Sequence, residues 1–148
     1  MTGSNEGDAA AARLDIDAAT DRATRQLELA ADPDRGGQVY LGSLREAHAI
    51  LALEEAGQLP GPVTRRARHG DCTDATGQDW DVKRPRDDVV YPPFDVGFFV
   101  EAHVRSEVLR SGENVLVDLT GLVDPANRRA LRAAVDAAGL GAHVRWYE

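Results

Sequence analysis

The chain is predicted to form an α/β domain with a mixed β-sheet flanked by helices, and three features of the sequence predict it. Several segments carry apolar residues at helical spacing. Short β-forming runs bounded by glycine and proline alternate with those segments. Two of these runs flank a glycine-containing loop, which is typical of a hairpin. A hairpin followed by helix, strand, helix and strand combines antiparallel and parallel neighbours in one sheet.

The first 36 residues are predicted to lie outside the main domain, which is expected over residues 37–148. Residues 1–8 are small and polar and are expected to be disordered. An acidic helix should follow over residues 17–31, where alanine and leucine recur at helical spacing. This helix either packs on the domain or serves as a separate interaction segment.

The main domain should begin with a mostly apolar helix over residues 43–59, in which Ser43 and Glu46 have the spacing of a capping box. A strand over residues 63–69 is expected next. The hairpin follows, with strands at residues 71–74 and 79–83 around a turn.

A polar, proline-rich loop over residues 84–93 is long for a compact domain, which suggests a functional role. Valines at helical spacing predict a helix over residues 95–110, ended by a glycine. The short apolar run 115–119 is typical of a buried strand. Asp124 followed by proline predicts a helix start, and residues 144–147 form the last expected strand.

Composition limits the classes of function. The net charge of -8 argues against a general nucleic-acid coat protein, because phosphate affinity depends on basic side chains. Residues 1–60 hold 11 acidic and 5 basic side chains, so most of the excess acidity lies outside the later segment. No apolar run approaches the ~20 residues of a membrane span, and no signal-peptide layout is present. Cys72 is the only cysteine, so no internal disulfide is expected. Cytoplasmic residence is expected, or delivery into a target-cell cytoplasm for an effector.

The segment Asp81-Val82-Lys83 is the strongest candidate for chemistry. In a strand, alternate side chains share a face, so Asp81 and Lys83 should be neighbours while Val82 points to the other face. A hairpin centred near residue 76 would place Asp71 across from Asp81, at the ~5 Å of a cross-strand pair. The two carboxylates could then hold one metal ion, with an ammonium beside it.

The chain has 17 lysine and arginine residues, and Lys83 is its single lysine. A guanidinium cannot simply replace a compact ammonium beside a metal ion, so this position for the lysine favours a catalytic role. Trp80 is predicted to be a core residue, because strand alternation turns it away from Asp81 and Lys83.

The segment Gly70 to Pro85, read with the helices and strands after it, resembles the PD-(D/E)xK nucleases of the restriction-endonuclease-like superfamily. It is especially similar to the nuclease domains of bacterial polymorphic toxins, in which an aspartate-bearing strand, a glycine turn and a Trp-Asp-Val-Lys strand recur. The similarity spans about residues 40–148. It implies a restriction-endonuclease-like core that hydrolyses DNA or RNA with Mg²⁺ or Mn²⁺, and a toxin or defence role with a cognate immunity protein as partner.

The resemblance also implies roles for individual residues. Asp71 and Asp81 would ligate the metal, and Lys83 would position water or stabilise developing charge. A glutamate of the first core helix often completes such sites, and Glu46 is the best candidate for it. Apart from the resemblance, Arg84 and Arg86 are expected to contact substrate phosphates because they lead from the active strand into the adjacent loop. Arg68 either does the same or belongs to a solvated face.

Two alternatives stay open at this point. Gly70 stands where the family usually has a proline, and Asp74 could take the ligand role assigned to Asp71. The chain could also be a catalytically inactive nuclease-fold module that binds protein through its acidic N-terminal helix. The choice between DNA and RNA cannot be read from the sequence.

Overall fold

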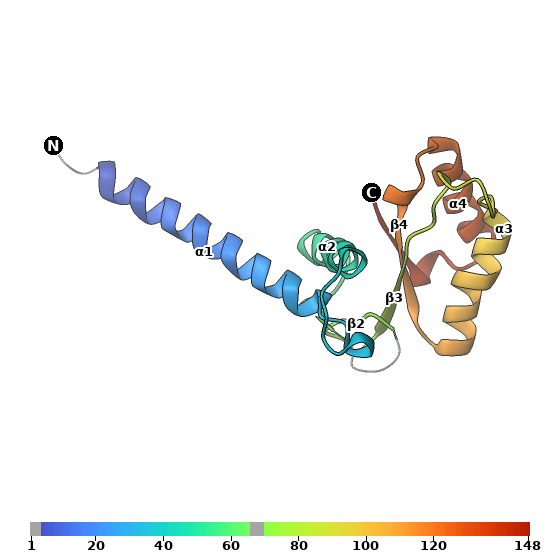
Figure 1. The fold of residues 1–148 in the computed structure, drawn as a ribbon, viewed down its shortest axis with the longest axis horizontal. Helices are drawn as coiled ribbons and strands as arrows, with labels where there is room; N and C mark the ends of the chain where they lie inside the picture. Colours follow the sequence, from blue (N-terminus) through green and yellow to red (C-terminus); the bar gives the residue numbers. More distant parts are fainter. Residues whose placement is uncertain (1–3, 66–69) are drawn as a thin grey trace. The chain divides into compact units, whose positions relative to one another are not determined.

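The computed structural model describes residues 4–65 and 70–148, and the chain divides into two compact units, residues 1–47 and 48–148. Figure 1 shows the course of the helices and strands along the chain. Among the described residues, no helix combines the length and the apolar character that a membrane span requires.

The first unit contains the long helix α1 (Ser4–Ala30), a short 3-10 turn (η1, Pro33–Arg35) and the start of α2 (Leu41–Glu55). The expectation of disorder over residues 1–8 was wrong from residue 4 onward, because α1 begins at Ser4. An alanine-rich run near its start explains the extension, since alanine has the highest helix propensity.

The predicted capping box of α2 was wrong, because the helix begins at Leu41, before Ser43. The Ser43 hydroxyl is buried; it accepts a hydrogen bond from the Tyr40 amide and donates one to the Tyr40 carbonyl. Ser43 therefore closes a turn at the start of α2. The helix also ends at Glu55, earlier than the predicted residue 59.

The second unit is built on one five-stranded mixed sheet in the order β1-β2-β3-β4-β5. The antiparallel part comprises β1 (Thr64–Arg65), β2 (Cys72–Thr73) and β3 (Asp79–Lys83). The parallel part adds β4 (Asn114–Asp118) and β5 (Val144–Tyr147). The predicted mixed α/β class and the hairpin are thus confirmed, while residues 66–69 of the first predicted strand lie outside the described part.

Helices follow the hairpin as the sequence predicts. The helix capped by Asp95 starts as α3 (Val96–Phe99) and continues in π-type turns (η2, Val100–Arg105; η3, Glu107–Ser111). Gly112 ends it with a φ of 68°, a conformation that favours glycine. Asp124 caps α4 (Pro125–Ala137) through a hydrogen bond from the Ala126 amide.

The helices α3 and α4 pack on one face of the sheet, on the side where Figure 1 draws them. The hydrophobic core between them includes Val104, Val115, Val117 and Leu131, all fully buried. In the parallel ladder Asp81 is the register partner of Val115 and Lys83 that of Val117. Because register partners share a sheet face, the acid and the amine of β3 lie on the face that these helices cover.

Candidate metal centre

Strand β3 sorts its side chains as the alternation rule predicts. Trp80 and Val82 are buried on one face, whereas Asp81 and Lys83 are half-buried on the other. The Lys83 ammonium lies 2.6 Å from Oδ2 of Asp81. The prediction that Asp81 and Lys83 are neighbours is therefore confirmed, as is the core position of Trp80, which is 2% exposed.

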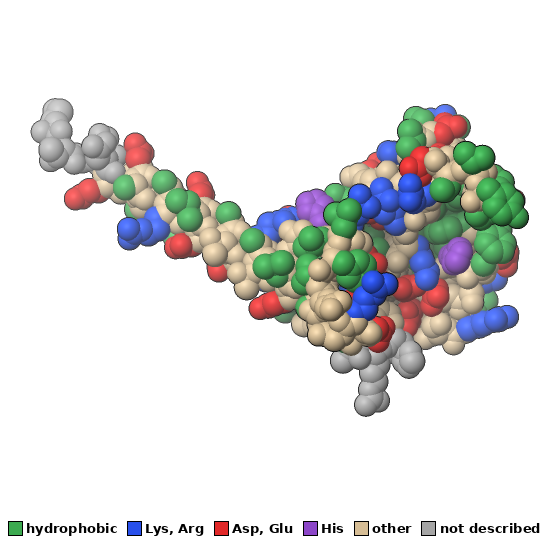
Figure 2. All heavy atoms as spheres, in the orientation of Figure 1, with side chains coloured by type: hydrophobic (Ala, Val, Ile, Leu, Met, Phe, Trp, Pro, Cys, Tyr) green, Lys and Arg blue, Asp and Glu red, His purple; other side chains and the backbone are tan. Residues whose placement is uncertain are grey.

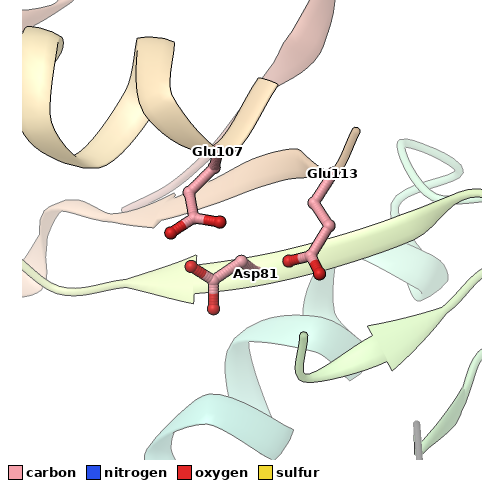
Figure 3. A group of neighbouring side chains, drawn as sticks. All are labelled: Asp81, Glu107 and Glu113. Atoms are coloured by element: carbon pink, nitrogen blue, oxygen red, sulfur yellow. The ribbon is translucent and has the colours of Figure 1, made fainter. Parts of the chain in front are cut away.

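Two glutamates join Asp81 in a group of three carboxylates (Figure 3). Glu107 comes from the last helical turns before β4, and Glu113 from the link between that helix and the strand. One oxygen from each of the three residues lies within 4.8 Å of the others. Three separate elements thus aim carboxylates at a common point, and this cluster is called the acidic triad below.

The backbone holds the two glutamates together. The carbonyl of Glu107 accepts hydrogen bonds from the amides of Gly112 and Glu113, the latter over 3.1 Å. These bonds satisfy a carbonyl at the end of a helix that would otherwise lack a partner within it. The same turn that ends the helix therefore fixes the spacing of the two carboxylates.

The donor set of the acidic triad suits a divalent cation. Mg²⁺ prefers six oxygens at about 2.1 Å in an octahedron, so adjacent ligands of one ion lie about 3.0 Å apart and opposite ligands about 4.2 Å. Small side-chain rotations would bring the three oxygens, now within 4.8 Å of one another, to these separations. Three carboxylates and the Lys83 ammonium together carry two formal negative charges, the charge that one divalent cation balances.

Lys83 faces two members of the acidic triad. Besides the contact with Asp81, its Nζ lies 3.5 Å from Oε1 of Glu107. Burial alone would lower the pKa of Lys83, but the hydrogen bond and the charge of Asp81, with the charge of Glu107, outweigh it and the pKa is raised. Lys83 is therefore a firmly protonated cation at neutral pH.

Gly70 packs against Glu113 of the acidic triad. It has a φ of 76°, and a Cβ placed on it would lie 3.0 Å from a carboxylate oxygen of Glu113. Both the backbone conformation and this close approach favour glycine. Glycine at this position thus allows tight packing against Glu113.

Asp71 is not a member of the acidic triad. Its Oδ2 accepts a hydrogen bond of 2.7 Å from the Val82 amide, and its Oδ1 lies 3.9 Å from Nη2 of Arg65. The carboxylate is thus engaged with the backbone of β3 and with a cation from β1. A ligand role for Asp71 stays a prediction.

Asp74 organises the hairpin loop. Its carboxylate accepts hydrogen bonds from Thr76, from the Gln78 amide and from Nε1 of Trp80. Burial alone would raise the pKa of Asp74, but these hydrogen bonds outweigh it and lower the pKa. The structure therefore gives Asp74 a structural role and does not favour it as the alternative ligand.

The remaining predicted site residues lie elsewhere. Glu46 belongs to the first unit, and its role as a ligand stays a prediction. Arg68 lies outside the described residues. Arg84 contacts Asp118 through Nε over 3.7 Å, and Arg86 forms a two-bond ion pair with Asp88. Both arginines line a pocket that also includes Lys83.

Sequence reasoning missed Glu107 and Glu113. Glu107 did leave a signal, since it lies three residues after Val104 and seven after Val100, on the apolar stripe of its helix. A charged residue on a core-facing stripe requires a partner. Glu113 left a weaker one, as an acidic residue two positions before the apolar run 115–119. In the structure its side chain is buried.

Comparisons of the chain with protein-family models, with curated proteins and with solved structures gave no match.

Proposed function

We propose that this chain is a divalent-metal-dependent phosphodiester hydrolase that acts on nucleic acid. The observation that carries the proposal is the convergence of Asp81, Glu107 and Glu113 beside the chain's single lysine. Compared with the sequence-based ligand set, Glu107 and Glu113 take the places considered for Asp71 and Glu46. The restriction-endonuclease-like core and a toxin or defence role remain part of this proposal.

Hydrolysis of a phosphodiester forms one bond and breaks one. The oxygen of water bonds to phosphorus, and the bond from phosphorus to one ester oxygen breaks, with its electron pair leaving on that oxygen. The attacking water loses a proton to solvent, and the leaving oxygen gains one. A bound divalent cation would polarise the phosphate and lower the pKa of a nearby water.

In this chain the acidic triad would hold the cation, and Lys83 would contact the phosphate. The ammonium can donate a hydrogen bond to a phosphate oxygen or to the attacking water, where it opposes developing negative charge. Its half-buried position strengthens that interaction relative to bulk water.

A test compares cleavage of plasmid DNA, single-stranded DNA and tRNA by the purified chain with Mg²⁺ or Mn²⁺. Asp81→Asn and Glu107→Gln keep the size of each side chain but remove a charged ligand, and about 100-fold or greater loss of rate is expected for each. Glu101→Gln is the matched control for Glu107→Gln, because Glu101 is on the same helix and is 64% exposed. Wild-type rates in both triad variants would refute the proposal.

The alternative is a non-catalytic module with the same fold. It is distinguished by metal binding, because a module without a working site should take up neither Mg²⁺ nor Mn²⁺ in titration calorimetry. Heat of binding that disappears in Asp81→Asn would support the hydrolase.

A further inference from the structure

A pocket of about 270 Å³ opens beside the acidic triad, within the second unit. Its wall includes Lys83, whose ammonium also contacts Asp81 and Glu107. Any molecule in the pocket would therefore lie next to the proposed point of cleavage. The volume is at the small end of the ~300–1,000 Å³ of ligand pockets, which suits one flat ring system.

The pocket gathers the phenylalanines of the chain. The sequence has 3 phenylalanines, and Phe94, Phe98 and Phe99 all line this pocket. His103 lies among them, with its ring centroid 5.3 Å from that of Phe99 and 5.9 Å from that of Phe98. Phe99 is buried, whereas Phe98 is 66% exposed. An exposed aromatic ring at the mouth of a pocket provides a surface on which another ring can stack.

Basic side chains form a second part of the rim, and Pro85, Pro93 and Asp95 complete the lining. Arg84 and Arg86 line the pocket together with Lys83, and Figure 2 shows basic, hydrophobic and histidine side chains on the visible face of the second unit. The Nε atom of Arg84 makes its contacts with Thr120 and Asp118. Arg86 is exposed and pairs with Asp88 at the surface, an arrangement that a phosphate can replace at low cost.

The loop that carries these arginines is fixed in place. The carboxylate of Asp87 accepts hydrogen bonds from the amides of Val123 and Asp124 and from Nδ2 of Asn127. Gly121 packs directly against the loop, since a Cβ on it would clash with the Pro85 carbonyl oxygen. The basic rim is thus held at a defined position relative to the aromatic wall.

We infer that this pocket receives an unpaired base of a single-stranded nucleic acid, which stacks on Phe98 while Arg84 and Arg86 contact the backbone phosphates. The His103 ring lies at 84° to that of Phe98, so it would contact the edge of the stacked base. Aromatic surfaces beside basic side chains are the usual means of binding single strands. In a duplex the bases are stacked within the helix and cannot enter such a pocket without being extruded. The inference rests on the proposed function, because it names the substrate class of that hydrolase.

The test measures binding separately from cleavage. The full chain is titrated, in EDTA, into oligonucleotides of single-stranded DNA, single-stranded RNA and the matching duplexes, each carrying one 2-aminopurine. Stacking of that base is read from its fluorescence, and affinity from the anisotropy of an end label. Single strands of DNA, RNA or both should bind at least about tenfold more tightly than duplexes, with a change in 2-aminopurine emission.

Phe98→Ala should weaken binding of single strands about 5-fold to 100-fold, the loss expected for one stacked base, and Phe98→Trp should restore it. Leu109→Ala is the matched control: Leu109 is 68% exposed in the same helical segment but does not line the pocket. Equal affinity for single strands and duplexes, equal effects of Phe98→Ala and Leu109→Ala, or no binding of any single strand would each overturn the inference.

The two proposals fail in different ways. If single strands bind in a Phe98-dependent way but the chain does not cleave them in the presence of Mg²⁺ or Mn²⁺, the proposed hydrolase is refuted and the proposed base pocket is supported. Cleavage that requires Asp81 but proceeds equally on single strands and duplexes, and equally in Phe98→Ala, would support the hydrolase and overturn the pocket.

Discussion

A single ammonium, that of Lys83, lies between two carboxylates of the acidic triad, 2.6 Å from Asp81 and 3.5 Å from Glu107. Charge alone does not specify a lysine at this place, since arginine supplies the charge at every other lysine or arginine position of the chain. Size and shape do, because the ammonium is a compact point charge and the guanidinium a wide planar fork. The lysine can therefore share a small space with a metal ion and a phosphate oxygen.

Lys83→Arg is expected to lower the cleavage rate by about 100-fold although it preserves the charge, because the larger group displaces either the metal or the phosphate. Cleavage of single-stranded DNA and tRNA under saturating Mg²⁺ measures it. Arg105→Lys, at a surface ion pair with Glu101, is the control and should keep the wild-type rate. Full activity of Lys83→Arg would contradict the claim that the site requires a lysine at this position.

Asp74 illustrates a carboxylate used for structure. Asp74→Asn should lower the free energy of unfolding by about 1–3 kcal/mol, because the amide cannot accept all the hydrogen bonds that the buried carboxylate does. Urea unfolding followed by tryptophan fluorescence measures it, since Trp80 donates to Asp74. The loss should come without a change in metal affinity.

The pH dependence of stability checks the same residue. The pKa of Asp74 is lower in the folded chain, so its contribution is present above the unfolded value near ~3.9 and is lost as the pH falls through the folded pKa. Wild-type stability should therefore fall more steeply below pH ~4 than that of Asp74→Asn. Parallel curves would contradict this assignment.

At the scale of elements, the site depends on where the helix before β4 ends. Gly112 stops that helix, and the hydrogen bonds to the Glu107 carbonyl place Glu113 directly before β4, at the end of that strand beside β3. Cys72 lies buried in the hairpin, where burial raises the pKa of its thiol. The loop after β3 is the second important element, because it carries the basic rim of the pocket.

Gly121→Ala is expected to displace that loop, because its Cβ would clash with the carbonyl oxygen of Pro85. Overpacking of this kind costs about 1–3 kcal/mol, and binding of single strands should weaken with it. Gly139→Ala is the control, since Gly139 has a φ of 71° but nothing within 4 Å of the added Cβ, so it should lose stability without losing binding. Unchanged stability and binding in Gly121→Ala would show that the loop position is not fixed in this way.

At the scale of the whole molecule, an acidic chain with a net charge of -8 is proposed to bind a polyanion. The distribution of charge makes the net negative charge compatible with binding to a polyanion. The acidic triad would be neutralised by the metal, and the basic residues that meet the substrate are concentrated around the pocket. Metal binding should then be linked to stability.

Mg²⁺ or Mn²⁺ at 100 times its dissociation constant should stabilise the second unit by about 2.7 kcal/mol. Unfolding followed by the fluorescence of Trp80 and Trp146, both in this unit, measures the increment. The increment should vanish in Asp81→Asn and in Glu113→Gln and persist in Glu101→Gln. An equal increment in all four proteins would place the ion elsewhere.

The sequence by itself determined the local features of this protein. The pairing of Asp81 with Lys83 followed from the two-residue period of a strand, the end of the helix at Gly112 from its conformational freedom, and the cap of α4 from Asp124. Each depends on neighbours within a few residues. The predictions for the start of α1 and for the cap of α2 were wrong. Several local patterns compete there because the chain is rich in small residues.

Only the tertiary structure decided which acids meet. Glu107 and Glu113 reach Asp81 because β4 pairs in parallel with β3 and the helix between the two strands packs on the face that bears Asp81. The antiparallel pairing of β1, β2 and β3 directs Asp71 toward Arg65 and the Val82 amide. Contacts of this kind depend on register and helix placement across long stretches of chain, which local periodicity does not encode.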